Sequence, residues 1–442
     1  MLKNSFREIF MIVCKFGGSS LAETAQIRKV EAILTSDSRR KITVVSAPGK
    51  RYSEDIKITD MLYTCHEEAS AGKSFSESFN TIRKRYLEIG EELGIKISNL
   101  ADELNIIENN IRQGESADYA ASRGEYLCAK ILAEYMGREF LDTEGLIVIA
   151  EDGSVDPVSY ELMAEKLSSD ANYIIPGFYG SDKDGFVKTF TRGGSDITGA
   201  IASRACNAEL YENWTDVSGI LMADPGIVHE PKTIAEITYE EARELASIGA
   251  AVFHEEAIAP VRDAAIPINI KNTNKPEDPG TRIVPHRDDQ SQPIIGVSGK
   301  IGYTRLFVKK LFLQKSPNFI LKVNTILKVY GITPEFSSVG FDSISLFFNS
   351  ALAGNKEEVF TRILTELEPD EISSDARIAM IGVVGEGLYD SKGIIAKVSA
   401  AVSSSGIAAR YINYGGSLIT CVIGVDETDY KTALEAIYSA IS

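Results

Sequence analysis

The chain has 442 residues, of which 44% are hydrophobic and 25% charged, as in a globular protein with more than one core. Its formal net charge of −17 argues against a nucleic-acid-binding surface. A nucleotide ligand remains compatible with this charge, because a small phosphate site needs only local cations. The five cysteines are scattered, without metal-ligand spacing, which is typical of a reduced cytoplasmic protein. No apolar run is long enough to cross a bilayer, so no membrane partner is expected.

A glycine turn follows the first predicted strand, at residues 11–13. The stretch Lys15-Phe16-Gly17-Gly18-Ser19-Ser20 leads into a segment with apolar residues at helical spacing. Glycines allow the backbone to approach an anion closely, and the start of a helix favours negative charge. Ser20 and Glu23 have the spacing of a capping box, which predicts the helix start. We interpret the stretch as a phosphate site, while the pattern alone also allows an ordinary turn with an exposed lysine.

Strands and helices alternate through the following residues. Apolar stretches predict strands at 41–45, 147–150, 173–178, 209–214 and 266–270. Helical patterns lie between them, among them 236–251, so we expect a largely parallel sheet covered by helices. The strand 41–45 ends in Ser46-Ala47-Pro48-Gly49, and such strand ends carry ligand loops in α/β sheets.

A second glycine turn precedes a helix predicted at 197–206. It reads Arg192-Gly193-Gly194-Ser195-Asp196, and an arginine can bind a carboxylate or phosphate through two hydrogen bonds. Asp196 by itself is a common kind of helix cap. Two Gly-Gly-Ser turns, each preceded by a cation, indicate two anion sites, as phosphoryl transfer between a donor and an acceptor requires.

From about residue 294 the pattern changes. A β-α-β-β-α-β order occurs about twice, which indicates an internal repeat of two ferredoxin-like modules. Neither copy contains a catalytic cluster. The modules suggest ligand sensing or oligomer contacts, and the alternative is a pair of inert spacers.

Four stretches together resemble a known family. Lys15-Phe16-Gly17-Gly18-Ser19-Ser20, Gly124-Glu125, Arg192-Gly193-Gly194-Ser195-Asp196 and Trp214-Thr215-Asp216-Val217 occur in the order seen in aspartate kinases of the amino-acid kinase superfamily. The resemblance runs from Met11 to the end of the chain. It implies an α/β catalytic domain over 11–290, with a mainly parallel sheet sandwiched by helices. It also implies a regulatory region over 291–442 with two βαββαβ ACT modules, about 300–370 and 376–442, which can interleave.

The resemblance implies a monofunctional aspartate kinase, because the chain ends after the second module. Such an enzyme uses ATP with Mg²⁺ to convert L-aspartate to 4-phospho-L-aspartate, the first step toward lysine, threonine and methionine. The acceptor carboxylate is already a nucleophile at neutral pH, so no general base is needed. Catalysis then consists of positioning and charge neutralisation.

The resemblance also assigns roles to residues. It makes Lys15, Arg192 and Asp196 catalytic. The residues that would bind ATP are Lys15, Gly17, Gly18, Ser19, Thr215 and Asp216. Those that would bind aspartate are Ser46, Thr59, Glu125, Arg192 and Ser195, with Glu125 on the α-ammonium. Magnesium would bridge phosphate oxygens, with no dedicated metal site in the protein. Leu221 and Gly226 stand where many relatives carry tyrosine and arginine, which changes the expected nucleotide contacts on that side.

The ACT modules imply feedback by an end-product amino acid, with lysine as the first choice and threonine as the second. The expected effector residues are Ser316, Phe319, Ser338 and Asp342. The modules also imply a homodimer or a dimer of dimers.

Two other functions compete with this assignment. One is another kinase of the same fold, acting on glutamate or carbamate. The pairing of Glu125 and Arg192 with ACT-like repeats argues against it, because recognition of a free α-amino acid needs both charges. The other is a non-catalytic amino-acid sensor, against which the intact Lys15, Arg192 and Asp196 count.

Overall fold

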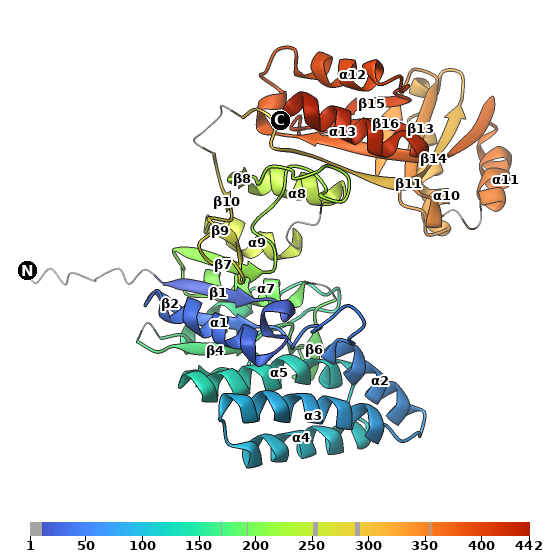
Figure 1. The fold of residues 1–442 in the computed structure, drawn as a ribbon. Helices are drawn as coiled ribbons and strands as arrows, with labels where there is room; N and C mark the ends of the chain where they lie inside the picture. Colours follow the sequence, from blue (N-terminus) through green and yellow to red (C-terminus); the bar gives the residue numbers. More distant parts are fainter. Residues whose placement is uncertain are drawn as a thin grey trace, which may run out of the picture. The chain divides into compact units, whose positions relative to one another are not determined.

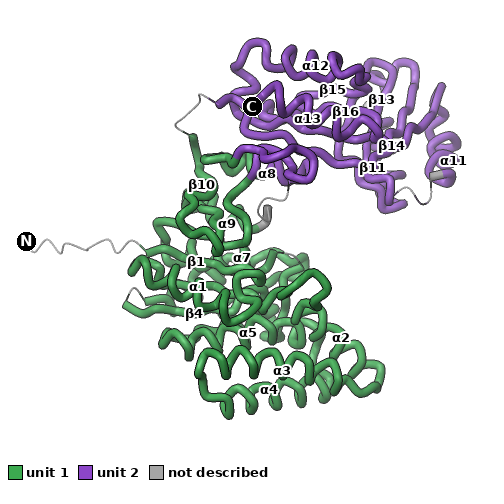
Figure 2. Tube along the Cα trace, in the orientation of Figure 1, with its two compact units in different colours: residues 1–220, 233–242, 252–287 green, residues 221–232, 243–251, 288–442 purple. Residues whose placement is uncertain are grey.

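The computed structural model describes residues 11–168, 170–191, 193–250, 255–287, 292–352, 354 and 356–442. The chain divides into two compact units (Figures 1 and 2). Unit 1 comprises Met1–Ile220, Thr233–Ala242 and Val252–Arg287. Unit 2 comprises Leu221–Lys232, Arg243–Ala251 and Asp288–Ser442, so it takes two short segments from the middle of the chain.

Unit 1 is built on a sheet of eight strands in the order β3-β4-β2-β1-β7-β9-β10-β8. Every neighbouring pair is parallel except β9 with β10. The strands are β1 Ile12–Phe16, β2 Arg40–Val45, β3 Glu139–Phe140, β4 Tyr173–Pro176, β7 Leu210–Thr215, β8 Glu236–Thr238, β9 Ile268–Asn272 and β10 Thr281–Val284. All five residues of β1 are buried, as expected for a central strand with helices on both faces. This confirms the predicted α/β class.

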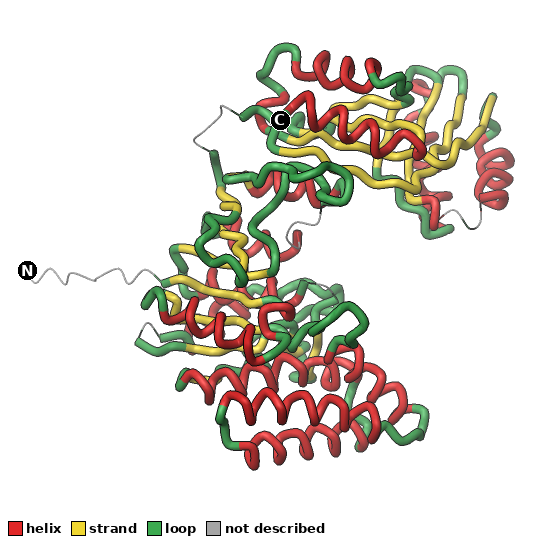
Figure 3. The backbone as a smooth tube through the Cα atoms, viewed as in Figure 1, coloured by secondary structure: helices red, strands yellow, loops and turns green. Residues whose placement is uncertain are grey.

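Helices cover this sheet, and α2 to α5 form a further helical layer (Figures 1 and 3). The helices that lie wholly within unit 1 are α1 Thr24–Thr35, α2 Ile58–Ser70, α3 Ser76–Leu93, α4 Ile97–Arg112, α5 Ala117–Met136, α6 Val158–Lys166, α7 Gly194–Ala205 and α9 Glu255–Asp263. A short hairpin, β5 Tyr179–Ser181 with β6 Val187–Thr189, and the 3₁₀ turn η1 Gly18–Leu21 complete the unit. The core between sheet and helices runs from β1 and α1 through α2 to α5.

Three local predictions were wrong. The capping box does not form: α1 begins at Thr24 without a side-chain cap, and the Ser20 hydroxyl bonds Thr273 Oγ1 at 2.7 Å instead. The residues 147–150 make only isolated bridges, at Val148 and Ile149, because their partners are the hairpin strand β5 and a local turn. The helix expected from residue 236 begins later, as α8 Tyr239–Ser247, because β8 occupies 236–238.

Unit 2 contains one antiparallel sheet of six strands, in the order β12-β13-β11-β14-β16-β15 (Figure 3). The strands are β11 Gly296–Lys309, β12 Phe336–Val339, β13 Ser343–Asn349, β14 Glu371–Val384, β15 Tyr411–Tyr414 and β16 Thr420–Asp426. The helices are α10 Pro317–Val329, α11 Lys356–Leu367, α12 Ile394–Ser404 and α13 Tyr430–Ile441.

The two long strands belong to both ferredoxin-like modules. The second half of β11 pairs with β13 and with the start of β14, and with α10, β12 and α11 it forms the first module. The second half of β14 pairs with β16 and with the start of β11, and with α12, β15 and α13 it forms the second. Each module has its own core. The predicted repeat is therefore present, and its copies share strands.

Candidate active site

The site is centred on Lys15, on the middle strand β1. Its ammonium lies 2.6 Å from Asp196 Oδ1, and the two side chains are only 10% and 17% exposed. Asn213 Nδ2 donates to the same carboxylate oxygen over 2.9 Å. Lys15 and Asn213 are partners in the β1–β7 register, so strand alternation places both side chains on one face of the sheet. A buried cation is thus held between two neighbouring strands and α7.

The first glycine turn is η1, directly after β1. The Gly17 N–H donates to the Trp214 carbonyl over 3.0 Å, so it is already engaged. Among the described residues, the N–H groups of Gly18 and Ser19 donate to no backbone carbonyl. A Cβ on Gly18 would lie 3.0 Å from the Ala47 carbonyl oxygen, which explains the need for glycine there. The turn therefore offers two free amides beside Lys15.

The second glycine turn begins α7. Gly193 has a left-handed backbone with φ of 59°, and the helix starts at Gly194 rather than at the predicted residue 197. Ser195 is buried, and it leaves no room for a side chain at residue 177, where a Cβ would lie 2.6 Å from the Ser195 Oγ. Asp196 stands in the first turn of α7 and pairs with Lys15. Arg192, the predicted catalytic and aspartate-binding arginine, lies outside the described residues.

Glu125 is buried in α5, close to the loop that follows β2. In the described part of the chain its Oε2 has no hydrogen-bond partner. Burial raises the pKa of this carboxyl to about 8, and the nearby N–H of Ala47 and the charges of Arg123 and Lys15 offset the rise only in part. Gly124 packs against Ala47, where an added Cβ would lie 2.9 Å from the alanine Cβ. A buried carboxyl without a partner is suited to accept an ammonium group.

The other predicted site residues end or follow strands at one edge of the sheet, except Thr59, which lies on a helix. Ser46 follows β2 and its N–H donates to the Phe16 carbonyl over 3.2 Å, while Thr59 stands in the first turn of α2. Thr215 ends β7 and donates to the Asp216 carboxylate over 3.2 Å. Because β1, β2 and β7 are parallel neighbours, their carboxyl ends bring these loops together.

The predicted effector residues lie in unit 2. The Phe319 side chain is buried in the core of the first module, so it faces away from solvent. Ser316 precedes α10 and Ser338 is exposed on β12. The Asp342 carboxylate accepts a hydrogen bond from the Phe312 N–H at 2.7 Å, and the Asp342 main-chain carbonyl accepts one from the Lys310 N–H at 2.8 Å.

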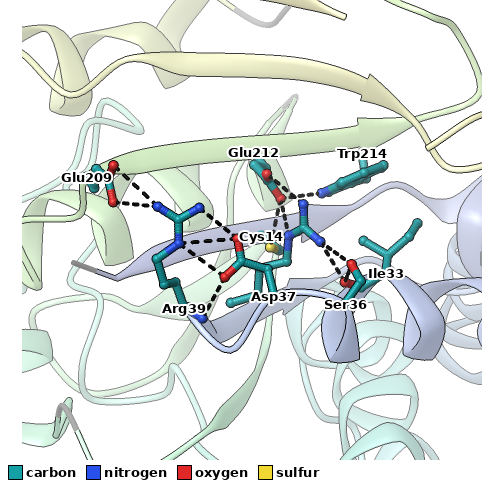
Figure 4. A network of polar contacts seen from close by, with 9 residues as sticks. Cys14, Ile33, Ser36, Asp37, Arg39, Glu209, Glu212 and Trp214 are labelled. Carbon is teal, nitrogen blue, oxygen red and sulfur yellow. Dashed lines mark hydrogen bonds and ion pairs between the residues drawn. The ribbon is translucent and has the colours of Figure 1, made fainter. Parts of the chain in front are cut away.

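A buried polar network lies on the opposite face of the same strands (Figure 4). The Glu212 carboxylate accepts hydrogen bonds from Arg40 Nε at 2.8 Å, Trp214 Nε1 at 2.9 Å and Cys14 Sγ at 3.3 Å. Burial is the main cause that raises the pKa of the Cys14 thiol well above its usual value, and the negative charge of Glu212 is the second. This cysteine therefore stays protonated. The network joins β1, β2 and β7 behind the site.

Sequence reasoning missed Asn213 and Glu212. Both stand in a stretch that it interpreted only as a strand. Alternation along 209–214 would have shown that Asn213 and Glu212 face opposite sides of the strand, but only the pairing of β7 with β1 puts Asn213 on the side of Lys15. Within the described ranges, no cluster of three or more His, Cys, Asp or Glu side chains could hold a metal ion. Nor does the structure contain, in the residues it describes, a helix long and apolar enough to cross a membrane.

Comparison with known proteins assigns this arrangement to a family. Residues 10–272 match the model of the amino acid kinase family, and residues 381–441 match an ACT domain. Aspartokinase 3 of Bacillus subtilis (strain 168) is 37% identical over 97% of this chain and 98% of its own length. The chain belongs to the aspartate kinases of the amino acid kinase family.

Solved aspartate kinase structures have the same fold. The crystal structure of Clostridium acetobutylicum aspartate kinase matches with a TM-score of 0.90 and 45% identity, over 98% of this chain and 100% of that one. E. coli aspartokinase III, in complex with aspartate and ADP, matches with a TM-score of 0.77 and 24% identity, over 98% and 99% of the two chains. Its complex with lysine and aspartate matches with a TM-score of 0.75 and 23% identity, over the same shares. The predicted catalytic fold with paired ACT modules is therefore confirmed.

Proposed function

We propose that this aspartate kinase transfers the γ-phosphoryl group of ATP to the side-chain carboxylate of L-aspartate. The observation that carries the proposal is the buried Lys15–Asp196 pair between two glycine turns, in a chain that matches aspartate kinases over nearly its whole length. The transferred group carries negative charge on several oxygens, and a lysine with free backbone amides neutralises it without forming a covalent bond.

Each side of the site has its own task. Lys15 and the Gly18 and Ser19 amides face the phosphates, and Asp196 with Asn213 keeps the lysine side chain in place. On the acceptor side, Glu125 binds the ammonium of aspartate. The carboxylate on the aspartate side chain attacks phosphorus in line with the departing ADP oxygen.

Further substrate contacts remain predictions from the sequence. Ser46, Thr59 and Ser195 would hold aspartate, together with Arg192. Thr215 and Asp216 would contact the nucleotide.

Magnesium fits this site as part of the nucleotide. Asp196 is committed to Lys15, and the proposal assigns Glu125 to the ammonium of aspartate. Neither carboxyl is therefore available as a ligand for a resident ion. Mg²⁺ would bind through phosphate oxygens and water, and would add charge neutralisation when bound.

We further propose feedback inhibition by lysine through the ACT modules, with threonine as the second choice. The support is the paired-module sheet of unit 2, and the lysine complex of E. coli aspartokinase III. Such inhibition requires that the effector binds two conformations with different affinity. A homodimer or dimer of dimers through these modules, in the cytoplasm, completes the proposal.

Trapping of the acyl phosphate with hydroxylamine tests the reaction. The purified chain is incubated with ATP, Mg²⁺ and either L-aspartate, L-glutamate or carbamate, and hydroxamate and ADP are measured. We expect both products with aspartate only. Lys15→Ala should lower kcat by about 10²- to 10³-fold, as for loss of one preorganised donor to a transition-state charge. The control is Lys29→Ala, because Lys29 is exposed on α1 and bonds Asn274.

Other outcomes have a clear meaning. Hydroxamate with glutamate or carbamate instead of aspartate would keep the kinase chemistry and change the substrate. No turnover with any acceptor would support the amino-acid sensor. Adding lysine or threonine to the working assay identifies the effector.

A further inference from the structure

Two loops of the candidate site touch each other through backbone atoms. The Gly49 N–H donates to the Gly18 carbonyl over 2.8 Å. A Cβ on Gly49 would lie 2.5 Å from the Gly18 carbonyl carbon, so the loop after β2 cannot carry a side chain at this contact. The position of the phosphate turn thus depends on the loop that follows β2.

The side chain of Arg85, from α3, joins these loops from behind. It is only 4% exposed, and its Nη2 donates both to the Ala22 carbonyl, at 3.2 Å, and to the Gly49 carbonyl. Ala22 directly follows η1, which carries Gly18 and Ser19. One guanidinium nitrogen therefore bridges the segment after the phosphate turn and the loop after β2.

Asp55 orients this arginine and shapes the rest of the loop. Its Oδ2 accepts hydrogen bonds from Arg51 Nε at 2.8 Å and from the Arg51 N–H at 3.0 Å, and lies 3.4 Å from Arg85 Nη1. Its Oδ1 accepts the Ile56 N–H at 3.1 Å. The hydrogen bond from Arg51, with the charge of Arg85, holds the pKa of Asp55 well below its usual value, so the carboxylate stays ionised.

The segment held by Asp55 lies between two predicted aspartate contacts. It runs from Arg51 to Ile56, with Ser46 before it and Thr59 after it. The same residues therefore connect the phosphate turn on one side with the acceptor loop on the other. Helix α3, which supplies Arg85, belongs to the helical layer that packs on α2 and α4.

We propose that Arg85, oriented by Asp55, is a positioning residue that sets the geometry of the phosphate turn and of the aspartate-binding loop. The inference rests on the proposed function of this site. Transferring a phosphoryl group requires donor and acceptor within reach and in line, and a displacement of about 1 Å can cost about 10²-fold in rate. In the described residues, Arg85 Nη2 makes both hydrogen bonds of the bridge, while Nη1 has only the ionic contact with Asp55 and Nε has no hydrogen-bond partner.

The test compares two arginines of the same helix. Arg85→Met removes the bridge, while Arg83→Met removes an ion pair with Glu108, 2.7 Å long, within the helical layer. Both variants are assayed well below their Tm, with kcat and the KM for ATP and aspartate measured separately. We expect Arg85→Met to lose about 10- to 100-fold in kcat and to raise the KM for aspartate, with Arg83→Met within about twofold of the wild type.

Two milder variants keep the test decisive if Arg85→Met does not fold. Arg85→Lys retains one donor to a carbonyl and should recover part of the lost rate. Asp55→Asn keeps the size of the side chain but weakens its ionic contact with Arg85. It should lower kcat less than Arg85→Met does. Wild-type kcat and KM in folded Arg85→Met, or in both milder variants, would overturn the inference. Failure of the proposed function is distinguishable, because the wild type itself would then form no aspartyl hydroxamate.

Discussion

In the site proposed for phosphoryl transfer, burial and pairing act differently on Lys15 and Glu125. Lys15 is buried, and the Asp196 carboxylate beside it compensates for the burial of a cation. Glu125 is buried without a partner on Oε2, so its neutral form is favoured until an ammonium group enters. Lys15 is thus held in place by an ion pair, whereas Glu125 Oε2 has no hydrogen-bond partner among the described residues.

The pKa of Glu125 gives a pH-dependent stability. Burial raises it from an ordinary 4.5 to about 8, so between these values the folded chain holds a proton that the unfolded chain releases. The free energy of unfolding therefore falls as pH rises through this range. Glu125→Gln removes this titrating group. The Tm of the variant minus the Tm of the wild type should therefore increase from about pH 5 to about pH 9 in the absence of aspartate.

Melting curves across this range provide the check. Glu91→Gln, at an exposed carboxyl on α3, is the control and should show no such trend. A Tm difference between Glu125→Gln and the wild type that stays constant with pH would contradict the prediction.

At the scale of elements, the site depends on three parallel strands being held in register. Main-chain hydrogen bonds pair β1 with β2 and with β7, and the Glu212 network adds side-chain contacts across all three (Figure 4). Since Lys15 and Asn213 face the other side of these strands, the network stabilises the site without taking part in the chemistry.

Two glutamates of this region offer a matched comparison. Glu212 is buried and paired with Arg40, whereas Glu209 pairs with Arg39 with both side chains more than a third exposed. Glu212→Gln leaves a buried guanidinium without its counter-charge and should cost about 3 to 5 kcal/mol of unfolding free energy. Glu209→Gln should cost about 0 to 1 kcal/mol, because water screens the exposed pair. Urea unfolding measures both, and equal losses would contradict the argument.

At the scale of the whole molecule, unit 2 is one sheet that contains two modules. Because β11 and β14 run through both, neither module has a complete set of strands by itself. The two ferredoxin-like cores should therefore unfold together, although each is a separate hydrophobic cluster.

A core substitution in the second module tests this coupling. Ile381 on β14 is fully buried, and Ile381→Ala should cost about 2 to 5 kcal/mol. Hydrogen exchange should then rise in β13 of the first module as well as in β16. Leu364→Ala, at an exposed position of α11, is the control. Faster exchange confined to the second module would show that the modules unfold independently.

Much of this protein could be predicted from its sequence. Glycine turns after apolar strands predicted the phosphate turn, because only glycine tolerates such close backbone approach, and Gly18 proved to have backbone atoms at that distance. The repeated order of strands and helices predicted the ferredoxin-like modules, because hydrophobic periodicity indicates which segments are strands and which are helices. The predicted capping box was wrong, because a serine hydroxyl can bond groups other than the helix start. Ser20 bonds Thr273, which follows a strand far along the chain, instead of capping α1.

The tertiary structure decided what depends on residues far apart in the chain. Periodicity is a local property, so it could predict β1 and β7 but not that they are neighbours, and hence not that Asn213 supports Asp196. Nor could it show that Arg85 reaches Gly49, since a charged residue in a helix is usually exposed. The sequence by itself thus determined the family, the fold class and the places of the two glycine turns. Only the tertiary structure decided which side chains hold those turns in place, because that depends on long-range packing.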